Sequence, residues 1–236
     1  MFTGWQRLVR FGFHLLYNQM AWTYDVVSWL VSLGEWRHWQ RAALPYLASN
    51  TKQLDVEAAR FILEIGHGPG HLLLELAAAG KQVVGLDLSS NMGRMAQNRL
   101  QRAGHQAQLI QGNVQELPFP EGSFDAVLST FPTDFIVDPA TLAAVHRALG
   151  ENGRFVIIPA AHLTGKGIIH RLIDSLFRLT GQQKEGVEME TACPRVDMGA
   201  VWQPLQQRFA HAGFETSIKQ IQRPRSSITL IVAQKR

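Results

Sequence analysis

Cysteine is almost absent from this chain of 236 residues, which has only Cys193. A single thiol cannot form an intrachain disulfide, so we expect a reducing compartment and a cytoplasmic location. Charged residues make up only 18% and hydrophobic residues 46%, which excludes a disordered chain and a charge-rich coiled coil. The 23 basic and 19 acidic residues leave a net charge of +4, too little to indicate nucleic-acid binding by itself.

The amino-terminal part has no hydrophobic run that could span a membrane. Its longest charge-free stretch, residues 11–24, contains His14, Asn18 and Gln19, and a span needs about 20 mostly apolar residues. It also lacks the features of a secretory signal. The same region is nevertheless crowded with aromatic side chains, and contact with a membrane surface stays open. Five of the six tryptophans lie in the first 39 residues: Trp5, Trp22, Trp29, Trp36 and Trp39.

The sequence shows no spacing typical of a metal site. Its nine histidines are scattered and form no ligand pair with carboxylate support. Cys193 has no legible basic partner, so we expect an inert thiol. We therefore expect no bound metal.

From residue 59 onward, short apolar runs alternate with amphipathic stretches. Strands are expected at 60–65, 82–86, 107–111, 124–129 and 154–159, with helices between them at 71–79, 90–103 and 139–149. This alternation is typical of a parallel sheet covered by helices on both faces. Gly80, Gly104 and Gly150 stand where helices are expected to end.

The carboxyl-terminal part breaks this alternation. A helix at 199–212 is followed by strands at 214–221 and 227–233, joined by about five residues, whereas a parallel crossover needs about a dozen. The last strand should therefore be antiparallel. The predicted fold class is α/β: a Rossmann-like, three-layer, seven-stranded and mostly parallel sheet with an antiparallel last strand.

A glycine-rich loop follows the first expected strand. Gly66, Gly68 and Gly70 occupy alternate positions just after Glu64. Such a loop lets backbone approach a ligand and leaves N–H groups free at a helix start. The dinucleotide fingerprint G-x-G-x-x-G would need a glycine where His71 stands, so it does not match.

The second strand ends at Asp87, about 20 residues beyond the loop, where an acid can bind both hydroxyls of a ribose. The alternative is an aspartate that caps the next helix. Ser89 and Ser90 already supply capping oxygens, so this role is less needed. Loop and acid together favour a cofactor that contains a nucleoside.

Five motifs then resemble, in family order, those of class I S-adenosylmethionine-dependent methyltransferases. They are E-x-G-x-G-x-G at 64–70, D-L-S-x-x-M at 87–92, G-N-V-Q-E-L-P-F at 112–119, F-D-A-V at 124–127 and L-G-E-N-G-R-F at 149–155. An antiparallel last strand is also a mark of this family. Residues 24–39 are similar to the start of the menaquinone and ubiquinone C-methyltransferases, whereas 165–200 are not.

The resemblance implies S-adenosylmethionine as cofactor and S-adenosylhomocysteine as product. It implies that the three glycines line methionine and ribose, that Glu64 orients the methionine amino group and that Asp87 holds the ribose hydroxyls. Leu88 is expected on the adenine, and Tyr24 is expected to reach the cofactor from a lid. The implied cofactor-binding set is Glu64, Gly66, His67, Gly68, Gly70, Asp87, Leu88, Met92, Asn113, Val114, Ser129 and Tyr24.

Two positions depart from the family pattern. Asn113 stands where the family usually has Asp, but its amide oxygen can still accept from the adenine amine, while the Val114 backbone meets the adenine edge. His67 replaces a small residue and is expected to face solvent or the substrate, more as a bystander than as a catalyst. Ser129 is expected to approach the methionine end.

The catalytic residue stays unknown. The sulfonium is an activated methyl donor, so alignment for in-line transfer can carry most of the acceleration. A base is needed only if the acceptor must lose a proton. Asp134, His67 and His162 lie on or near loops expected to face the site, and none stands out.

We expect residues 1–50 to form a helical lid or substrate segment and 51–236 to form the methyltransferase domain, with a substrate-side insertion at 162–198. Residues 165–179 have apolar residues at helical spacing and several basic ones. They read either as an ordinary amphipathic helix over the sheet or as a basic, apolar lid. The second interpretation suits a small hydrophobic acceptor, quinone- or lipid-like, and peripheral membrane contact.

Other acceptors and functions fit the sequence less well than this hypothesis does. A nucleic-acid partner is not expected, because residues 129–132 lack the N/D-P-P-Y/F pattern and the basic tail reads as a solvated edge. A dinucleotide-dependent oxidoreductase is disfavoured by His71. A binding protein without turnover on the same fold stays open. The sequence does not determine the oligomeric state, the pathway or whether C, N or O is methylated.

Overall fold

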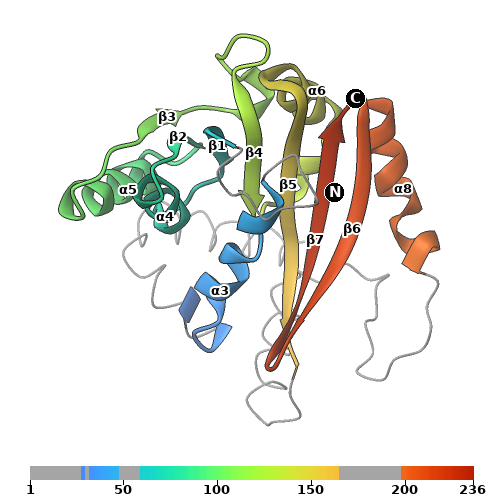
Figure 1. Ribbon diagram of the computed structural model, residues 1–236, viewed down its shortest axis with the longest axis horizontal. Helices are drawn as coiled ribbons and strands as arrows, with labels where there is room; N and C mark the ends of the chain where they lie inside the picture. Colours follow the sequence, from blue (N-terminus) through green and yellow to red (C-terminus); the bar gives the residue numbers. More distant parts are fainter. Residues whose placement is uncertain (1–27, 30–31, 48–58, 165–197) are drawn as a thin grey trace, which may run out of the picture.

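A seven-stranded sheet forms the centre of the computed structural model, which describes residues 28–29, 32–47, 59–164 and 198–236 (Figure 1). The strand order is β3-β2-β1-β4-β5-β7-β6. Strands β1 to β5 pair in parallel, whereas β7 runs antiparallel to both β5 and β6. This confirms the predicted fold class. The strands are β1 (Phe61–Ile65), β2 (Gln82–Asp87), β3 (Gln108–Gln111), β4 (Phe124–Thr130), β5 (Leu149–Leu163), β6 (Phe214–Arg223) and β7 (Ser226–Lys235).

Helices cover both faces of the sheet and make three layers (Figure 1). One hydrophobic cluster joins α3 and α4 to the sheet, with Trp39, Leu72 and Ile158 among its members. The other lies under α6 and α8 and includes Val145 and Phe209. The helices are α3 (Trp36–Arg41), α4 (His71–Ala78), α5 (Ser90–Arg102), α6 (Pro139–Ala148) and α8 (Met198–His211), with 3-10 turns η2 (Leu44–Tyr46), η3 (Val114–Glu116) and η4 (Asp134–Val137).

Local sequence signals explain where α5 and α6 begin. The Ser89 hydroxyl accepts from the Met92 N–H at 3.4 Å, and the Asp138 carboxylate accepts from the Ala140 N–H at 2.8 Å, so each is the N-cap of its helix. Pro139 takes the first position of α6, where no N–H is needed.

Three sequence predictions need correction. Gly150 does not end a helix, because α6 stops at Ala148 and β5 starts at Leu149. Strand β5 has 15 residues and not the six expected, since its pairing with β7 continues to Leu163, beyond the end of β4. Residues 35–48, whose sequence pattern predicts one helix strained or ended by Pro45, instead form α3 and η2, and Pro45, which has no N–H to donate, lies within η2.

The first four parallel strands end at one edge of the sheet, and this edge carries the glycine loop, Asp87, Gly112 and Phe131. Helix α3 and the far part of the β5–β7 ribbon lie beside it (Figure 1). In open parallel sheets, ligands bind outside the carboxyl ends of the strands. This edge is therefore where a site should be sought.

Some predicted features fall outside the described residues. They include Tyr24, Cys193, the amphipathic stretch 165–179, most of the expected insertion 162–198 and much of the expected lid 1–50. Within the described ranges, no helix is long and apolar enough to span a bilayer.

Candidate cofactor site

The glycine loop is held to the strand edge by backbone hydrogen bonds. The Gly66 N–H donates to the Leu86 carbonyl at 2.7 Å, and the Gly70 N–H donates to the His67 carbonyl at 3.1 Å. Gly66, Gly68 and Gly70 all have left-handed backbone, with φ of 67°, 54° and 78°. These angles favour glycine over any side chain.

The three glycines differ in what surrounds them. A Cβ on Gly70 would lie 2.6 Å from the Ala96 Cβ, so the loop needs glycine there to pack against α5. A Cβ on Gly66 or Gly68 would meet no atom of the described residues within 4 Å. Two of the three positions therefore leave open space that a ligand could fill.

Glu64 is a buried acid without a partner. Its side chain is on β1, the residue is 1% exposed, and neither carboxylate oxygen has a hydrogen-bond partner among the described residues. Burial raises the pKa of the Glu64 carboxyl well above its ordinary value, and the Asp87 and Glu75 carboxylates raise it further. Buried acids without partners are costly. A cationic ligand group next to the loop would satisfy this one.

Asp87 is oriented from two sides. Its Oδ1 accepts from the Ser89 N–H at 2.8 Å and its Oδ2 accepts from the Gly68 N–H at 2.9 Å. Each carboxylate oxygen keeps a second lone pair. The side chain is partly buried, and it can accept hydrogen bonds from two adjacent hydroxyls without giving up its own contacts.

The expected adenine side lies at the ends of β2 and β3. Leu88 is 75% exposed, which is unusual for a leucine and leaves its side chain open to a planar ligand. The Asn113 Oδ1 accepts from the Gln115 N–H at 3.1 Å, and its Nδ2 donates to Gln115 Oε1 at 3.2 Å. The Asn113 amide is therefore already oriented, while Val114 is buried.

Three further residues of the predicted cofactor-binding set, Ser129, Met92 and Tyr24, are placed differently from one another. The Ser129 hydroxyl is 1% exposed and donates to the Ile65 carbonyl at 2.9 Å, so it ties the end of β4 to the end of β1. Met92 is fully buried in the first turn of α5. Tyr24 lies outside the described residues.

The expectation that the His67 side chain faces solvent or the substrate is wrong. His67 is 3% exposed, and its ring carbon Cδ2 lies 2.8 Å from where a Cβ on Gly85 would be. Leu73 from α4 and Leu109 from β3 crowd the same position. The ring is therefore packed against the sheet because Gly85 has no side chain, which the sequence around residue 67 does not reveal.

The other two candidate bases, Asp134 at the start of η4 and His162 near the end of β5, are exposed. Among the described residues, no group of three or more His, Cys, Asp or Glu side chains could hold a metal ion.

An aromatic stack at the same edge was missed by sequence reasoning. Trp36 of α3 stacks on Phe131, the residue after β4, with centroids 4.3 Å apart and planes at 28°. Trp39 lies 6.0 Å from the same Phe131 ring. Phe131 has φ of 54°, a strained value for a residue other than glycine, and its N–H donates to the Ile158 carbonyl at 2.7 Å. The sequence feature that could have predicted this stack is the concentration of tryptophans in the first 39 residues.

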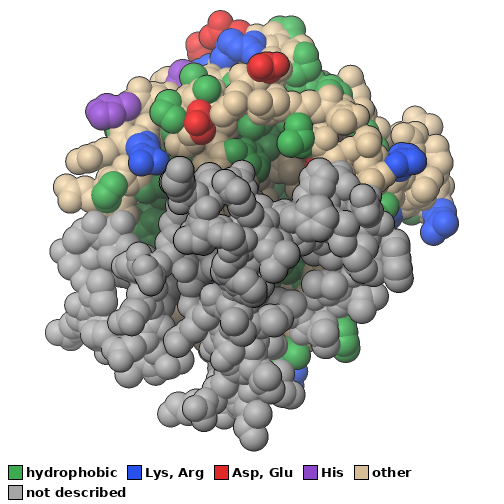
Figure 2. Space-filling view, turned by 180° about the vertical axis from the view of Figure 1, so that it is seen from behind, with side chains coloured by type: hydrophobic (Ala, Val, Ile, Leu, Met, Phe, Trp, Pro, Cys, Tyr) green, Lys and Arg blue, Asp and Glu red, His purple; other side chains and the backbone are tan. Residues whose placement is uncertain are grey.

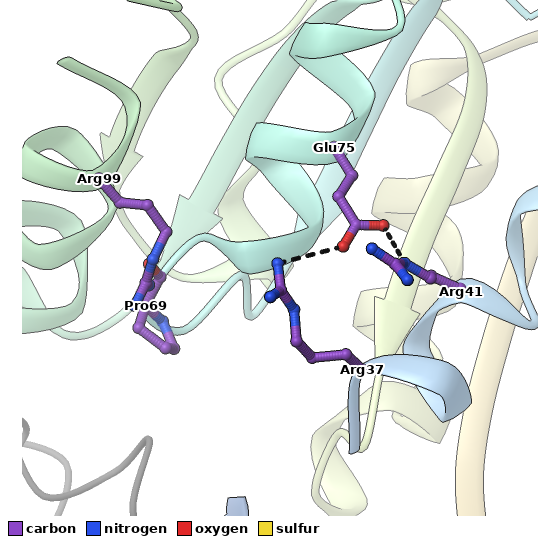
Figure 3. Close-up of polar contacts among 5 residues, drawn as sticks. All are labelled: Arg37, Arg41, Pro69, Glu75 and Arg99. Atoms are coloured by element: carbon purple, nitrogen blue, oxygen red, sulfur yellow. Dashed lines mark hydrogen bonds and ion pairs between the residues drawn. The ribbon is translucent and has the colours of Figure 1, made fainter. Parts of the chain in front are cut away.

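Polar contacts fix α3 at this edge (Figure 3). The Glu75 carboxylate of α4 accepts from Arg41 Nε at 2.7 Å through Oε2 and from Arg37 Nη2 at 3.5 Å through Oε1. A buried hydrogen bond runs from Gln40 Nε2 to the Thr130 hydroxyl at 3.2 Å. Exposed ion pairs contribute about 0–1 kcal/mol each, so the buried contacts of Trp39 and Gln40 dominate.

Charged side chains are scattered on the face shown in Figure 2, where described hydrophobic and uncharged surface lies between them. No broad Lys and Arg patch is visible among the described residues of that face. The picture agrees with the small net charge of the chain.

This chain is similar to known proteins in both sequence and fold. Residues 62–153 match the family model described as "Methyltransferase domain". The demethylmenaquinone methyltransferase of Tropheryma whipplei (strain Twist) is 31% identical over 148 residues, which are 62% of this chain and 58% of that protein. The ubiquinone/menaquinone biosynthesis C-methyltransferase UbiE of Citrifermentans bemidjiense is 30% identical over 149 residues, covering 61% and 60%. The chain thus matches less than two thirds of the length of these two relatives.

A solved structure shares the fold at low identity. It is the geranyl diphosphate C-methyltransferase of Streptomyces coelicolor A3(2), solved in complex with Mg²⁺, geranyl diphosphate and S-adenosyl-L-homocysteine. It has a TM-score of 0.55 and 12% identity, and the match covers 84% of this chain and 78% of that one. The sheet order, the glycine loop and the matched family model agree: residues 62–153 are similar to a methyltransferase domain, and the described sheet has the fold of this solved methyltransferase.

Proposed function

We propose that this protein transfers a methyl group from S-adenosylmethionine to a small hydrophobic acceptor. The observation that supports the proposal is that Glu64, a buried acid beside the glycine loop, has no hydrogen-bond partner among the described residues, which also leave open space over Gly66 and Gly68. The ammonium group of the cofactor's methionine end is the cation that such an acid needs. A dinucleotide offers no ammonium group, so the arrangement favours S-adenosylmethionine.

In this proposal, each residue around the loop contacts a different part of the cofactor. Glu64 binds the ammonium group, directly or through water, and Asp87 accepts from both ribose hydroxyls. Gly66 and Gly68 leave room for the backbone to contact the ligand, and the exposed Leu88 side chain covers the adenine. Asn113 accepts from the adenine amine through the second lone pair of its amide oxygen.

The cofactor supplies an activated methyl group, and the protein supplies position. Three hydrogen bonds, from Gly66, Gly68 and Gly70, fix the loop, and Ser129 fixes the end of β4 beside it. Preorganised geometry of this kind can carry most of the acceleration of an in-line transfer. No side chain among the described residues stands out as a general base, which suits an acceptor that is itself nucleophilic or already ionised.

The acceptor side is aromatic. Trp36 and Phe131 stack at the carboxyl end of β4, next to the strand that holds Ser129. Both rings are only partly buried, so they keep surface for a flat apolar molecule. The names of the two sequence relatives refer to quinone biosynthesis. We infer a quinone- or lipid-like acceptor, a cytoplasmic enzyme and contact with a membrane surface.

Native mass spectrometry of the purified protein tests cofactor and acceptor together. The expected result is co-purified or added S-adenosylmethionine at one copy per chain, with no binding of NAD at the same concentration. A demethylated naphthoquinol, the reduced and nucleophilic form, should then be methylated at a ring carbon with loss of the ring proton to water and release of S-adenosylhomocysteine, and Phe131→Leu should slow this release. The matched control is Phe119→Leu, a partly buried ring on the other face of the sheet.

Three results would overturn the proposal. Binding of NAD in place of S-adenosylmethionine would favour an oxidoreductase. Turnover of soluble polar metabolites alone, together with no association with liposomes of anionic phospholipid, would discard the hydrophobic acceptor. Cofactor binding with no S-adenosylhomocysteine release from any acceptor would favour a binding protein on this fold.

A further inference from the structure

The His67 ring occupies a notch that the sheet leaves for it. Gly85 on β2 has no side chain, and the ring carbon Cδ2 of His67 lies 2.8 Å from the place of the missing Cβ. Side-chain carbons of Leu73 and Leu109 lie 2.7 and 3.0 Å from the same point. Glycine inside a strand often marks a close approach of another group, and here that group is an imidazole.

The hydrogen bond of the ring identifies its protonation state. His67 Nδ1 lies 2.7 Å from the Gly68 carbonyl oxygen, which can only accept, so Nδ1 carries the hydrogen. His67 Nε2 is buried and has no hydrogen-bond partner among the described residues. A second hydrogen on Nε2 would find no acceptor among the described residues, and burial disfavours a charge on the ring, so both favour the neutral form.

The same loop connects His67 to the acid on β2. The Gly68 N–H donates to Asp87 Oδ2 at 2.9 Å, while the carbonyl of Gly68 accepts from the His67 ring. The backbone carbonyl of His67 also accepts from the Gly70 N–H at 3.1 Å. Residue 67 thus supports the loop on both sides of Gly68, the residue that orients Asp87.

We propose that His67 is a positioning residue, whose neutral ring in the Gly85 notch holds the glycine loop so that Asp87 faces the ribose of the cofactor. It acts through Gly68 and touches neither the cofactor nor the acceptor with its ring. The inference rests on the proposed binding of S-adenosylmethionine.

Protonation should release this support. The ring borders a cavity of about 310 Å³ between α5 and the strand edge, whose titratable groups are Asp87 and Arg94 besides His67 itself, while α4 and β3 present Leu73 and Leu109 to the ring. Burial lowers the pKa of His67, and the Asp87 carboxylate and the Gly68 carbonyl oppose this in part. The neutral ring therefore persists at neutral pH, and the loop loses its support as the pH falls through the lowered pKa.

Calorimetric titration with S-adenosylhomocysteine, together with thermal unfolding, tests the role. His67→Asn keeps a donor near the Nδ1 position but cannot titrate, and His67→Phe keeps a ring without a donor. At about pH 7.5 we expect His67→Asn to bind within about threefold of wild type and His67→Phe to bind about 3- to 10-fold more weakly. The fall in the unfolding temperature of His67→Phe should be too small to explain its loss of affinity. The substitution also removes Nε2, a buried atom with no hydrogen-bond partner among the described residues.

The pH profile separates positioning from packing. Lowering the pH should weaken binding more for wild type than for His67→Asn, since Glu64 titrates in both proteins and His67 only in one. Gly85→Ala should weaken binding in the same way as His67→Phe because its methyl group displaces the ring. The matched control is His105→Asn, a histidine in the loop after α5 that should leave the affinity unchanged.

Equal affinities of wild type and His67→Phe, or identical pH profiles of wild type and His67→Asn, would overturn the positioning role while leaving the proposed function intact. Absence of S-adenosylhomocysteine binding by wild type itself would overturn the proposed function and this inference with it.

Discussion

Replacing Glu64 by methionine should stabilise the ligand-free protein and abolish its stabilisation by cofactor. Methionine has about the same length as glutamate, is apolar and fills irregular space. Glu64 is 1% exposed and both its oxygens lack partners among the described residues. A buried polar group left unsatisfied costs about 1–3 kcal/mol, and the substitution removes that cost. For a domain of this size the gain corresponds to about 2–12 °C in the unfolding temperature.

The gain should depend on pH in a defined direction. The folded protein holds the pKa of Glu64 above its ordinary value, so it keeps a proton that the unfolded chain has lost. Wild-type stability therefore falls as the pH rises from the ordinary carboxyl value towards the raised one, and the methionine variant does not share this loss. The advantage of Glu64→Met should be larger at about pH 8 than at about pH 5.

Thermal unfolding with and without S-adenosylhomocysteine measures both effects. At a ligand concentration of 100 times Kd, wild type should gain about 2.7 kcal/mol and Glu64→Met should gain nothing measurable. Glu121→Met is the control, since that acid is exposed and should leave both values nearly unchanged. A methionine variant that is less stable than wild type, or that is still stabilised by the ligand, would refute the reasoning.

Further predictions concern the loop, the proton balance and α3. Gly70→Ala should unfold more easily than wild type by at least about 1 kcal/mol in urea, since its Cβ would lie 2.6 Å from Ala96 and φ is 78°. The new Cβ of Gly68→Ala meets no atom of the described part of the chain within 4 Å, so calorimetry should show a loss of S-adenosylhomocysteine affinity larger than its loss of stability. Cofactor binding at about pH 6 should release protons from Glu64, seen as different calorimetric heats in two buffers of unlike ionisation enthalpy. Glu75→Gln should cost at most about 1 kcal/mol, and less in high salt, because its ion pairs with Arg37 and Arg41 are largely exposed.

The local parts of the fold were predictable from sequence. Alternating apolar runs placed every strand of the sheet, and the short link before β7 predicted its antiparallel direction. The spacing of Glu64, the three glycines and Asp87 was sufficient to locate the candidate site. Turns and strand ends depend mainly on residues that are close in sequence.

Contacts between distant segments were not predictable in this way. The burial of His67 depends on Gly85, a residue on another strand, and no pattern near residue 67 reports it. The length of β5 depends on its pairing with β7, and the stack of Trp36 on Phe131 depends on where α3 docks. In each case the decisive neighbour is set by tertiary packing and not by local periodicity.

Calorimetric titration of wild type and Glu64→Gln with S-adenosylhomocysteine tests the central claim most directly. It shows whether Glu64, the buried acid beside the glycine loop, binds the cofactor. The account predicts one site per chain in wild type and a loss of more than about tenfold in affinity when the charge is removed, since buried charged contacts are worth about 1.5–3 kcal/mol. Equal affinity of the two proteins, or no binding by wild type, would contradict it.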